Sequence, residues 1–281
     1  MKNKKKLFHW LFFRIIITIV LIIILGPIIW MGLTAIKTES QALSEDPIWF
    51  FSPTFDNFIQ LWTGGEYDQQ PYLNRFLNSL IIASITTLLS LCIGLPAAYS
   101  LVRIRSRQSK YILSIVLLFR MFPPVIFVIP YFILVSRMGF VDTYISLILP
   151  YTALSVSLVV WMMQTFINQL PIELEEAALV DGCTRLSAFI RVIFPLLRPG
   201  LIASSIFTFL TAWNEFLLAL ALTRRNAATL PVKLYGFIGE HGIDWTGLAA
   251  GSITMIIPIF ILVIIGGRHM IQGLSSGAVK G

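Results

Sequence analysis

The chain has 281 residues, of which 57% are hydrophobic and only 12% are charged, and its mean hydropathy is +0.82. This composition excludes an ordinary soluble domain of that length and is typical of a protein that crosses a membrane several times. The formal net charge of +7 would suggest nucleic acid in a soluble protein, but membrane topology explains it here and no nucleic-acid partner is expected.

The N-terminal residues 1–6 are basic and are followed by a long apolar run. This run is longer than the core of a signal peptide and no small-residue cleavage pattern follows it, so we interpret it as a retained first span. Further apolar runs lie near the ~20 residues that cross ~30 Å of hydrocarbon. They predict an all-α integral membrane protein with a single transmembrane domain over residues 1–281. The six expected spans are 15–36, 76–102, 112–135, 144–166, 200–222 and 248–266.

Lysine and arginine residues indicate the orientation of these spans. If the N-terminus lies inside, 14 of the 21 lysine and arginine residues fall in inside segments and 6 in outside segments. This bias predicts that both termini are cytoplasmic. The polar loop 168–199 and the tail 268–281 are then cytoplasmic too. The longest outside loop, about residues 37–75, carries tryptophan and phenylalanine residues suited to the membrane interface.

The loop between the fourth and fifth spans contains signals for two short helices. Pro171 suits the first position of a helix, acidic residues follow in its first turns, and Gly182 fits its end. Thr184 is expected to cap a second helix that runs to about Phe194, before Pro195. Neither helix is long enough to span a bilayer. The residues alone leave two interpretations: a connector on the lipid headgroups, or an element that another protein grips.

The spacing of residues in this loop resembles the EAA loop of ABC importer permeases. The loop reads Glu176-Ala177-Ala178, three residues, Gly182, nine residues, then Val192-Ile193-Phe194-Pro195. Val192 and Phe194 replace the isoleucine and leucine that are usual in the family. The resemblance implies a six-span type I importer permease with a cytoplasmic pair of coupling helices. The residues that it implies for coupling to an ATPase are Glu176, Ala177, Ala178, Asp181, Gly182, Arg185 and Pro195.

Other stretches narrow the resemblance to carbohydrate-importer permeases of the maltose-transporter (MalG) type. The C-terminal residues 271–281 are similar to the glycine-rich tail of that group, with Ser275 in place of threonine. Residues 213–216, residues 53–58 and the pair Asn78-Ser79 also look like that group. The resemblance implies that the tail contacts the ATPase subunits. The tail residues concerned are Gly273, Gly277, Lys280 and Gly281.

The resemblance implies a function in ATP-driven sugar import and a set of partners. This chain would form half of the pathway, beside a second and different permease subunit in the lipid bilayer. A dimer of ATP-binding subunits, with ATP and magnesium, would lie below, and an extracytoplasmic sugar-binding protein would deliver the cargo. The expected location is the bacterial cytoplasmic (inner) membrane. The sequence contains no phosphate-binding loop, so it is not expected to be an enzyme by itself or to hold a cofactor.

Two ionisable residues, Arg120 and Glu215, fall inside the expected spans. A charge there costs at least ~2.5–3.5 kcal/mol on insertion scales, so it usually faces a cavity or a partner. Glu215 and the adjacent Asn214 either contact sugar hydroxyls or hold helices together, and Trp213 is more typical of packing than of a sugar platform. A direct Arg120–Glu215 pair is disfavoured, because their expected depths differ by ~11 Å. Arg120 has an alternative partner in the carbonyl groups near Pro123.

A secondary transporter driven by an ion gradient is the alternative function for such a composition. The sequence of such a transporter would be expected to contain inverted repeats and several carboxylates near the midplane of the membrane. The sequence contains no visible repeat and one carboxylate within a span. A receptor-like scaffold would leave the EAA spacing without an explanation.

Overall fold

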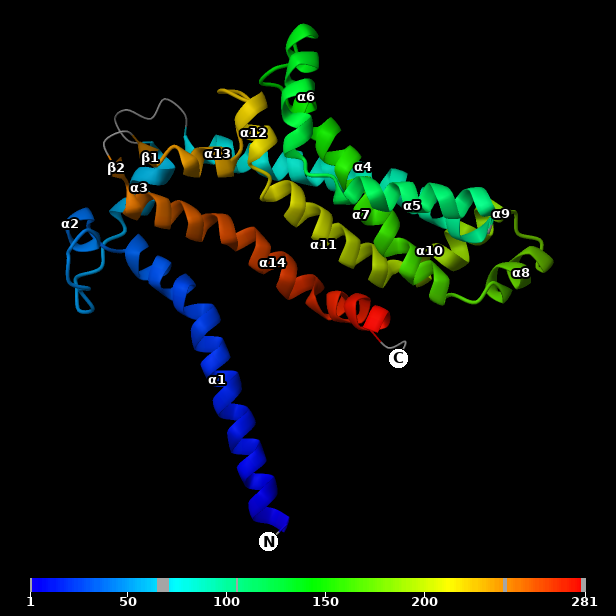
Figure 1. Cartoon of the computed structure of the whole chain (residues 1–281), viewed down its shortest axis with the longest axis horizontal. Helices are drawn as coiled ribbons and strands as arrows, with labels where there is room; N and C mark the ends of the chain where they lie inside the picture. Colours follow the sequence, from blue (N-terminus) through cyan, green and yellow to red (C-terminus); the bar gives the residue numbers. More distant parts are fainter. Residues whose placement is uncertain (1, 65–70, 105, 240–241, 279–281) are drawn as a thin grey trace. The chain divides into compact units, whose positions relative to one another are not determined.

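The computed structural model describes residues 2–64, 71–104, 106–239 and 242–278, and this part of the chain is almost entirely helical (Figure 1). The chain divides into two compact units. Unit 1 comprises Met1–Tyr72 and Leu234–Ile257, and unit 2 comprises Leu73–Lys233 and Pro258–Gly281. The single domain predicted from the sequence therefore contains two units, each described below by itself.

Helices of membrane-spanning length occur in both units. Within the described ranges, four helices are long and apolar enough to cross a membrane, and two further pairs of helices are bent at a short break. Counting each bent pair as one span gives up to six spans, in agreement with the number predicted. The four long helices are α1 (Lys2–Ala35), α4 (Tyr72–Arg103), α7 (Tyr144–Gln169) and α14 (Trp245–Ala278).

The third predicted span is not a straight helix. It consists of α5 (Arg107–Met121) and α6 (Val125–Arg137), which meet at an angle of 92°. Phe122 has an extended backbone (φ −72°, ψ 127°), as expected for a residue before proline, and Pro123 and Pro124 follow it. Pro130 lies inside α6. The break therefore occurs at the paired prolines.

The fifth predicted span is interrupted where the sequence predicts one helix over 200–222. Helix α11 (Arg198–Trp213) ends, residues 214–216 leave the helix, and α12 (Leu217–Leu222) begins. The prediction of an uninterrupted helix is therefore wrong. The Glu215 carboxylate explains the break, because it accepts hydrogen bonds from the first free amide groups of α12, those of Leu218 (2.9 Å) and Ala219 (3.2 Å).

In unit 1 the segment after α1 is fastened by the residues around α3 (Asp56–Thr63). The Asn57 side-chain amide donates to the carbonyl oxygens of Ala35 (2.9 Å) and Lys37 (2.8 Å), and the Thr54 amide donates to Ile36 (2.9 Å). These bonds satisfy carbonyl groups that the end of α1 leaves without helical partners. The remaining elements wholly in unit 1 are α2 (Glu39–Ala42) and the antiparallel pair β1 (Ile238–Gly239) and β2 (Gly242–Ile243).

In unit 2 the helix α7 packs against α4, α5, α11 and α12. Two glycines permit close approaches to α7. A Cβ atom on Gly94 of α4 would lie 2.7 Å from the Val159 side chain, and one on Gly200 of α11 would lie 2.6 Å from the Phe166 ring. Small residues are the usual means of packing membrane helices this closely. The buried core of this packing is formed by Leu95, Ala98, Val159, Val160, Met163, Ile167, Ile193 and Leu197.

The connector between α12 and α13 (Leu230–Tyr235) is held by side chains from other elements. The Asp142 carboxylate accepts hydrogen bonds of 2.9–3.1 Å from the four consecutive amides of residues 224–227. The Asn78 side chain donates to the carbonyl oxygens of Asn226 and Ala228, and Arg75 donates to that of Arg225. The Ser79 hydroxyl accepts from the amide of Leu230 (2.8 Å). The Asn78-Ser79 pair found in the sequence therefore fastens this connector.

The environment of Asp142 also sets its protonation. Partial burial raises the pKa of the Asp142 carboxyl, but the hydrogen bonds from the connector amides favour the charged form and bring the pKa below its ordinary value of 3.8. Because the pKa is lower in the folded chain, the carboxylate contributes stability above its ordinary pKa. That contribution is lost as the pH falls through the lowered pKa of the folded state.

Removing this carboxylate is expected to destabilise unit 2 at neutral pH and to flatten its acid dependence. Asp142 has a left-handed backbone (φ 62°). Asp142→Gly therefore tests the carboxylate alone, whereas Asp142→Ala adds backbone strain and is expected to lower the melting temperature further. The measurement is thermal unfolding of the purified complex between about pH 7 and pH 3. Equal acid dependence in the wild type and in Asp142→Gly would contradict the assignment.

Candidate functional site

The polar loop between the fourth and fifth spans folds as two short helical arms joined at Gly182. The first arm is α8 (Glu173–Val180), which begins two residues after Pro171. Gly182 has φ 88°, and the Cys183 amide donates to the Ala178 carbonyl (3.0 Å), which closes the end of α8. The Thr184 hydroxyl accepts from the Ser187 amide (3.2 Å) and caps the second arm, as predicted.

The second arm changes its helical form before Pro195. It begins as α9 (Arg185–Ala188), widens into the π-helix η1 (Phe189–Ile193) and continues as α10 (Phe194–Leu196). The predicted end at Phe194 is therefore wrong, because the arm continues through Pro195. A proline in a helix has no N–H group and its ring clashes with the carbonyl group four residues earlier, here that of Arg191. The wider π-turn before Pro195 accommodates both effects, and π-turns are frequent at functional sites.

Most residues that the EAA resemblance implicates lie on the surface of the two arms. Ala178 is buried against the loop itself, with 7% of its surface exposed. The other motif residues are accessible, and large apolar side chains accompany them: Val180 is 86% exposed and Leu186 is 68% exposed. Within the described part of the chain, no hydrogen bond or ion pair involves the Glu176 carboxylate. The exposed motif residues are Glu176, Ala177, Asp181, Gly182 and Arg185, and Pro195 is half-buried.

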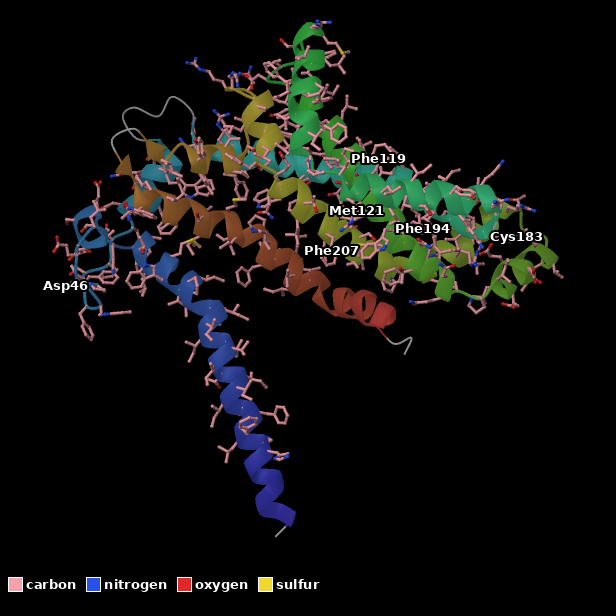
Figure 2. All side chains as sticks on the ribbon, viewed as in Figure 1. Asp46, Phe119, Met121, Cys183, Phe194 and Phe207 are labelled. Carbon is pink, nitrogen blue, oxygen red and sulfur yellow. The ribbon has the colours of Figure 1, made fainter. Side chains whose placement is uncertain are left out.

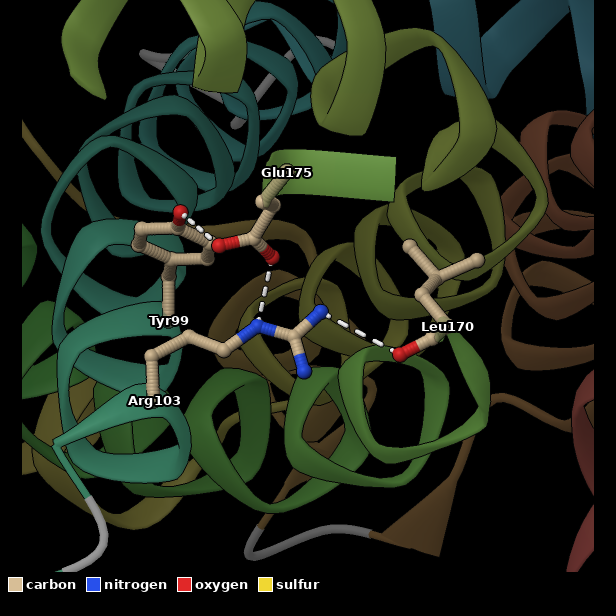
Figure 3. A network of polar contacts seen from close by, with 4 residues as sticks. All are labelled: Tyr99, Arg103, Leu170 and Glu175. Carbon is tan, nitrogen blue, oxygen red and sulfur yellow. Dashed lines mark hydrogen bonds and ion pairs between the residues drawn. The ribbon is translucent and has the colours of Figure 1, made fainter. Parts of the chain in front are cut away.

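Glu175, the neighbour of the exposed Glu176, ties the first arm to α4 (Figure 3). Its carboxylate accepts a hydrogen bond from the Tyr99 hydroxyl (2.7 Å) and forms an ion pair with the Arg103 guanidinium (2.5 Å). Arg103 also donates to the Leu170 carbonyl at the end of α7 (3.2 Å). One glutamate of the loop is thereby bonded to two residues of α4, and one of these, Arg103, also holds the end of α7.

This network is well protected from water. The side chains of Arg103 and Glu175 are only 10% and 13% exposed. Charge-assisted hydrogen bonds are stronger than neutral ones, and reduced screening strengthens them further. The Tyr99 ring also lies 4.7 Å from the Phe189 ring of the second arm, centroid to centroid. Both arms therefore contact the same turn of α4.

The second arm is also part of the hydrophobic core of unit 2. Ile193 and Leu197, at the end of the arm, are buried together with Ala98 of α4 and with Met163 and Ile167 of α7. Interiors packed at this density transmit displacements because they have few voids. The arms are therefore connected to α4 and α7 through both the polar network and the apolar core.

The predicted tail residues fall near the edge of the described structure. Helix α14 does not end with the predicted last span at residue 266 but continues to Ala278. Gly273 and Gly277 lie within this helix. Lys280 and Gly281 lie outside the described residues.

Two of the candidates within the fifth span are engaged by the chain itself. Trp213 is 1% exposed, stacks on Phe209 with ring centroids 5.4 Å apart and meets the edge of Phe76 at 5.7 Å. The Glu215 carboxylate, besides capping α12, accepts a hydrogen bond from the Tyr151 hydroxyl of α7 (2.5 Å). These contacts favour a role in helix packing for both residues.

The other two candidates, Asn214 and Arg120, are exposed. The Asn214 amide donates to the Leu210 carbonyl (2.9 Å), which leaves its side-chain oxygen accessible. Arg120 lies near the end of α5, the segment where Figure 2 labels Phe119 and Met121. Its guanidinium carbon is 5.0 Å from the centre of the Trp161 ring. Among the described contacts, Arg120 forms neither the disfavoured pair with Glu215 nor the alternative bond to a carbonyl group near Pro123.

This geometry defines a helical protein that has helices of membrane-spanning length and two short exposed arms. Comparisons with known proteins identify its family. Residues 90–274 match the sequence profile of the binding-protein-dependent transport system inner membrane component. The sulfoquinovosyl glycerol transport system permease protein SmoH of Agrobacterium fabrum is 36% identical, with 92% of this chain and 89% of that protein aligned. The trehalose/maltose transport system permease protein MalG of Thermococcus litoralis is 34% identical, with 92% and 93% aligned.

The chain belongs to this family of inner-membrane transport components. A solved structure supports the fold: a chain of a bacterial ABC transporter that imports the acidic polysaccharide alginate superposes with a TM-score of 0.77. That chain shares 19% sequence identity, over 94% of this chain and 97% of its own length. The resemblance to ABC importer permeases is thereby confirmed, and the alternative of a secondary transporter is set aside.

Proposed function

We propose that this chain is a permease subunit of an ATP-driven sugar importer, which forms half of the transmembrane pathway. The observation that carries this proposal is the pair of exposed arms fastened to α4 and α7 by the Glu175 network. The relatives named for sulfoquinovosyl glycerol and for trehalose and maltose favour a carbohydrate as the cargo.

The arms would act as the coupling element. An ATP-binding subunit would grip the surface around Glu176, Gly182 and Val180, where polar and apolar groups alternate and are exposed. Closure of the two ATP-binding subunits would displace the arms, and the Arg103–Glu175 pair would carry α4 and α7 with them. ATP binding would thus shift the populations of the outward-open and inward-open states.

Four kinds of partner follow from this proposal. A second, different permease subunit would complete the pathway, a dimer of ATP-binding subunits would hold ATP and magnesium, and a sugar-binding protein would dock on the opposite side. The lipid bilayer is the fourth partner. In this arrangement both termini and the coupling arms would be cytoplasmic, and the C-terminal residues 268–281 would reach the ATP-binding subunits through Gly273, Gly277, Lys280 and Gly281.

The exposed candidates would line the pathway and the buried ones would shape it. Asn214 and Arg120 present accessible polar groups at breaks in two spans, where a sugar hydroxyl group has room to approach. Trp213 and Glu215 are engaged within unit 2 and would hold α11, α12 and α7 in place. The positive charge of Arg120 also suits a carbohydrate that bears an acidic group.

Loss of the coupling surface is expected to separate this chain from its ATP-binding subunits. Gly182→Val places a β-branched side chain at φ 88°, which distorts the joint between the arms, and Glu176→Ala removes an exposed carboxylate. The measurement is a mild-detergent pull-down of the tagged chain, expressed with its neighbouring genes, combined with sugar uptake in vesicles. We expect the wild type to recover a second permease and an ATPase, and both variants to lose the ATPase and the uptake.

The matched control is Glu173→Ala. Glu173 lies on the same helix, carries the same charge and has no described contact. It is expected to retain both the ATPase and uptake. Uptake by the purified chain alone, driven by an ion gradient without ATP, would overturn the proposed function.

A further inference from the structure

Unit 1 contains a cavity that the coupling mechanism does not use. Its volume is about 360 Å³, and it lies between the end of α1 and the first turns of α14. Its lining combines aromatic, apolar and polar side chains with one positive charge. The residues that define it here are Trp30, Met31, Thr34, Lys37, Leu248 and Ser252.

Lys37 is the unusual member of this lining. It is 3% exposed, and its ammonium nitrogen lies 5.0 Å from the centre of the Trp30 ring and 5.1 Å from that of Phe51. Among the described residues, no carboxylate lies within 4.0 Å of this nitrogen. Two aromatic faces offset only part of the cost of burying an ammonium group, because they replace few of its hydrogen bonds to water.

The polar groups of the cavity are suited to an anion. The ammonium group carries three N–H donors and no acceptor. Within the described structure, the Ser252 hydroxyl has no bonded partner and is free to donate. The Thr34 hydroxyl already donates to the Trp30 carbonyl (3.0 Å). The free donors thus come from the turn after α1 and from α14, and they border one cavity.

The surroundings of the cavity point to a lipid rather than a soluble anion. In the apolar segment His9–Ala35 of α1, the 18-residue window that defines the span contains no residue buried inside the chain. Three half-exposed indole rings surround the end of this segment: Trp30 (43%), Trp49 (64%) and Trp245 (48%). Such rings are typical of the headgroup level of a bilayer. Met31 and Leu248 add an apolar wall on which an acyl chain can lie.

We propose that this cavity binds an anionic phospholipid, with the phosphate group against the Lys37 ammonium and the Ser252 hydroxyl. One acyl chain would run along the wall formed by Met31 and Leu248. The lipid would neutralise a charge that the folded chain leaves buried, and it would fix the end of α1 against α14. The proposal does not depend on the cargo or on the direction of transport.

The test is native mass spectrometry of the assembled complex after mild delipidation. The complex is then titrated with phosphatidylglycerol, with phosphatidylcholine or with inorganic phosphate. We expect one phosphatidylglycerol to be retained for each copy of this chain, with at least tenfold weaker retention of phosphatidylcholine. Lys37→Met removes the charge, and Ser252→Leu fills the cavity but keeps the charge. Both variants are expected to weaken phosphatidylglycerol retention about tenfold or more.

The matched charge control is Arg137→Met, which removes an exposed cation that has no described partner. Retention in this variant is expected to equal that of the wild type. Lys37→Arg is expected to restore binding, which separates loss of charge from loss of folding. Equal retention in the wild type, Lys37→Met and Ser252→Leu would overturn the proposal. So would saturation of the site by inorganic phosphate, or a partner-subunit carboxylate found against Lys37.

Discussion

Replacing Glu175 by alanine is expected to abolish sugar uptake while the ATP-binding subunits stay bound and continue to hydrolyse ATP. The reason is that Glu175 bonds to α4 rather than to the exposed surface of the arms. Without it the arms still offer Glu176 and Gly182 to a partner, but their motion no longer reaches α4 through a charged pair. Uptake into vesicles and ATPase activity, measured on the same preparation, check this result.

The size of the effect follows from the burial of the pair. Removing one partner of a buried, hydrogen-bonded ion pair costs about 3–5 kcal/mol, because the other charge remains without compensation. A loss of about 3 kcal/mol lowers the population of the docked arm by roughly two orders of magnitude relative to undocked arms. We therefore expect uptake below about a tenth of the wild-type rate, and ATP hydrolysis that no longer responds to the sugar-binding protein.

Three variants separate this role from a general effect of charge. Glu173→Ala removes a carboxylate from the same turn of α8 without breaking the network and is expected to transport within about twofold of the wild type. Glu175→Gln keeps an acceptor for Tyr99 but loses the ion pair. Its uptake rate should therefore fall between those of Glu173→Ala and Glu175→Ala. The exchange of Arg103→Glu with Glu175→Arg restores opposite charges and is expected to recover part of the uptake. Normal coupling in Glu175→Ala would contradict the assignment.

Hydropathy predicts the spans well because a bilayer imposes a length on every helix that crosses it. The apolar runs of α1, α4, α7 and α14 meet that length in one piece and were found on this basis. The bend between α5 and α6 was also predictable, because two consecutive prolines remove consecutive amide donors. The break before α12 was not, because Phe216 and Leu217 continue the apolar run. It depends on the Glu215 carboxylate reaching the next two free amides.

In the candidate site, too, the sequence predicts features of the local backbone but not contacts between residues far apart in the chain. Motif spacing predicts the joint at Gly182 and the cap at Thr184, which are local features of the backbone. It does not predict Glu175, whose partners Tyr99 and Arg103 lie more than seventy positions earlier in the chain. Tyr99 and Arg103 are four residues apart and share a face of α4. That spacing is the one signal in the sequence for a polar contact at the end of this helix.

Asp142 is a second residue that sequence reasoning missed. Its four amide donors lie more than eighty positions later, in a connector with no regular structure. Nothing in the local pattern around Asp142 distinguishes it from an ordinary turn aspartate. Only the folded chain shows that this carboxylate binds four consecutive amides of the connector after α12, beside the bonds from Arg75, Asn78 and Ser79.

Glu215 caps α12, the helix before this connector. A mild and a severe substitution of Glu215 are expected to differ in their effects on uptake and on stability. In Glu215→Gln the side-chain oxygen can still accept from the Leu218 amide while the new amide group donates to the Tyr151 oxygen, so that only the longer bond from the Ala219 amide is lost. Uptake rate, sugar preference and yield of the complex should therefore stay within about twofold of the wild type. Glu215→Leu loses the helix cap, about 1 kcal/mol, and leaves the buried Tyr151 hydroxyl without a partner, about 1–3 kcal/mol.

The expected result for Glu215→Leu is a lower yield of the assembled complex and a lower melting temperature, with an unchanged KM for sugar in the fraction that survives. Tyr151→Phe should lower stability less, because the carboxylate keeps its two amide donors. Asn214→Ala is the comparison within the same break, because Asn214 is exposed and is expected to raise KM without lowering the yield. If Glu215→Gln instead changes sugar preference at normal yield, the carboxylate faces the pathway, and its bonds to Tyr151 and α12 belong to only one state of the transport cycle.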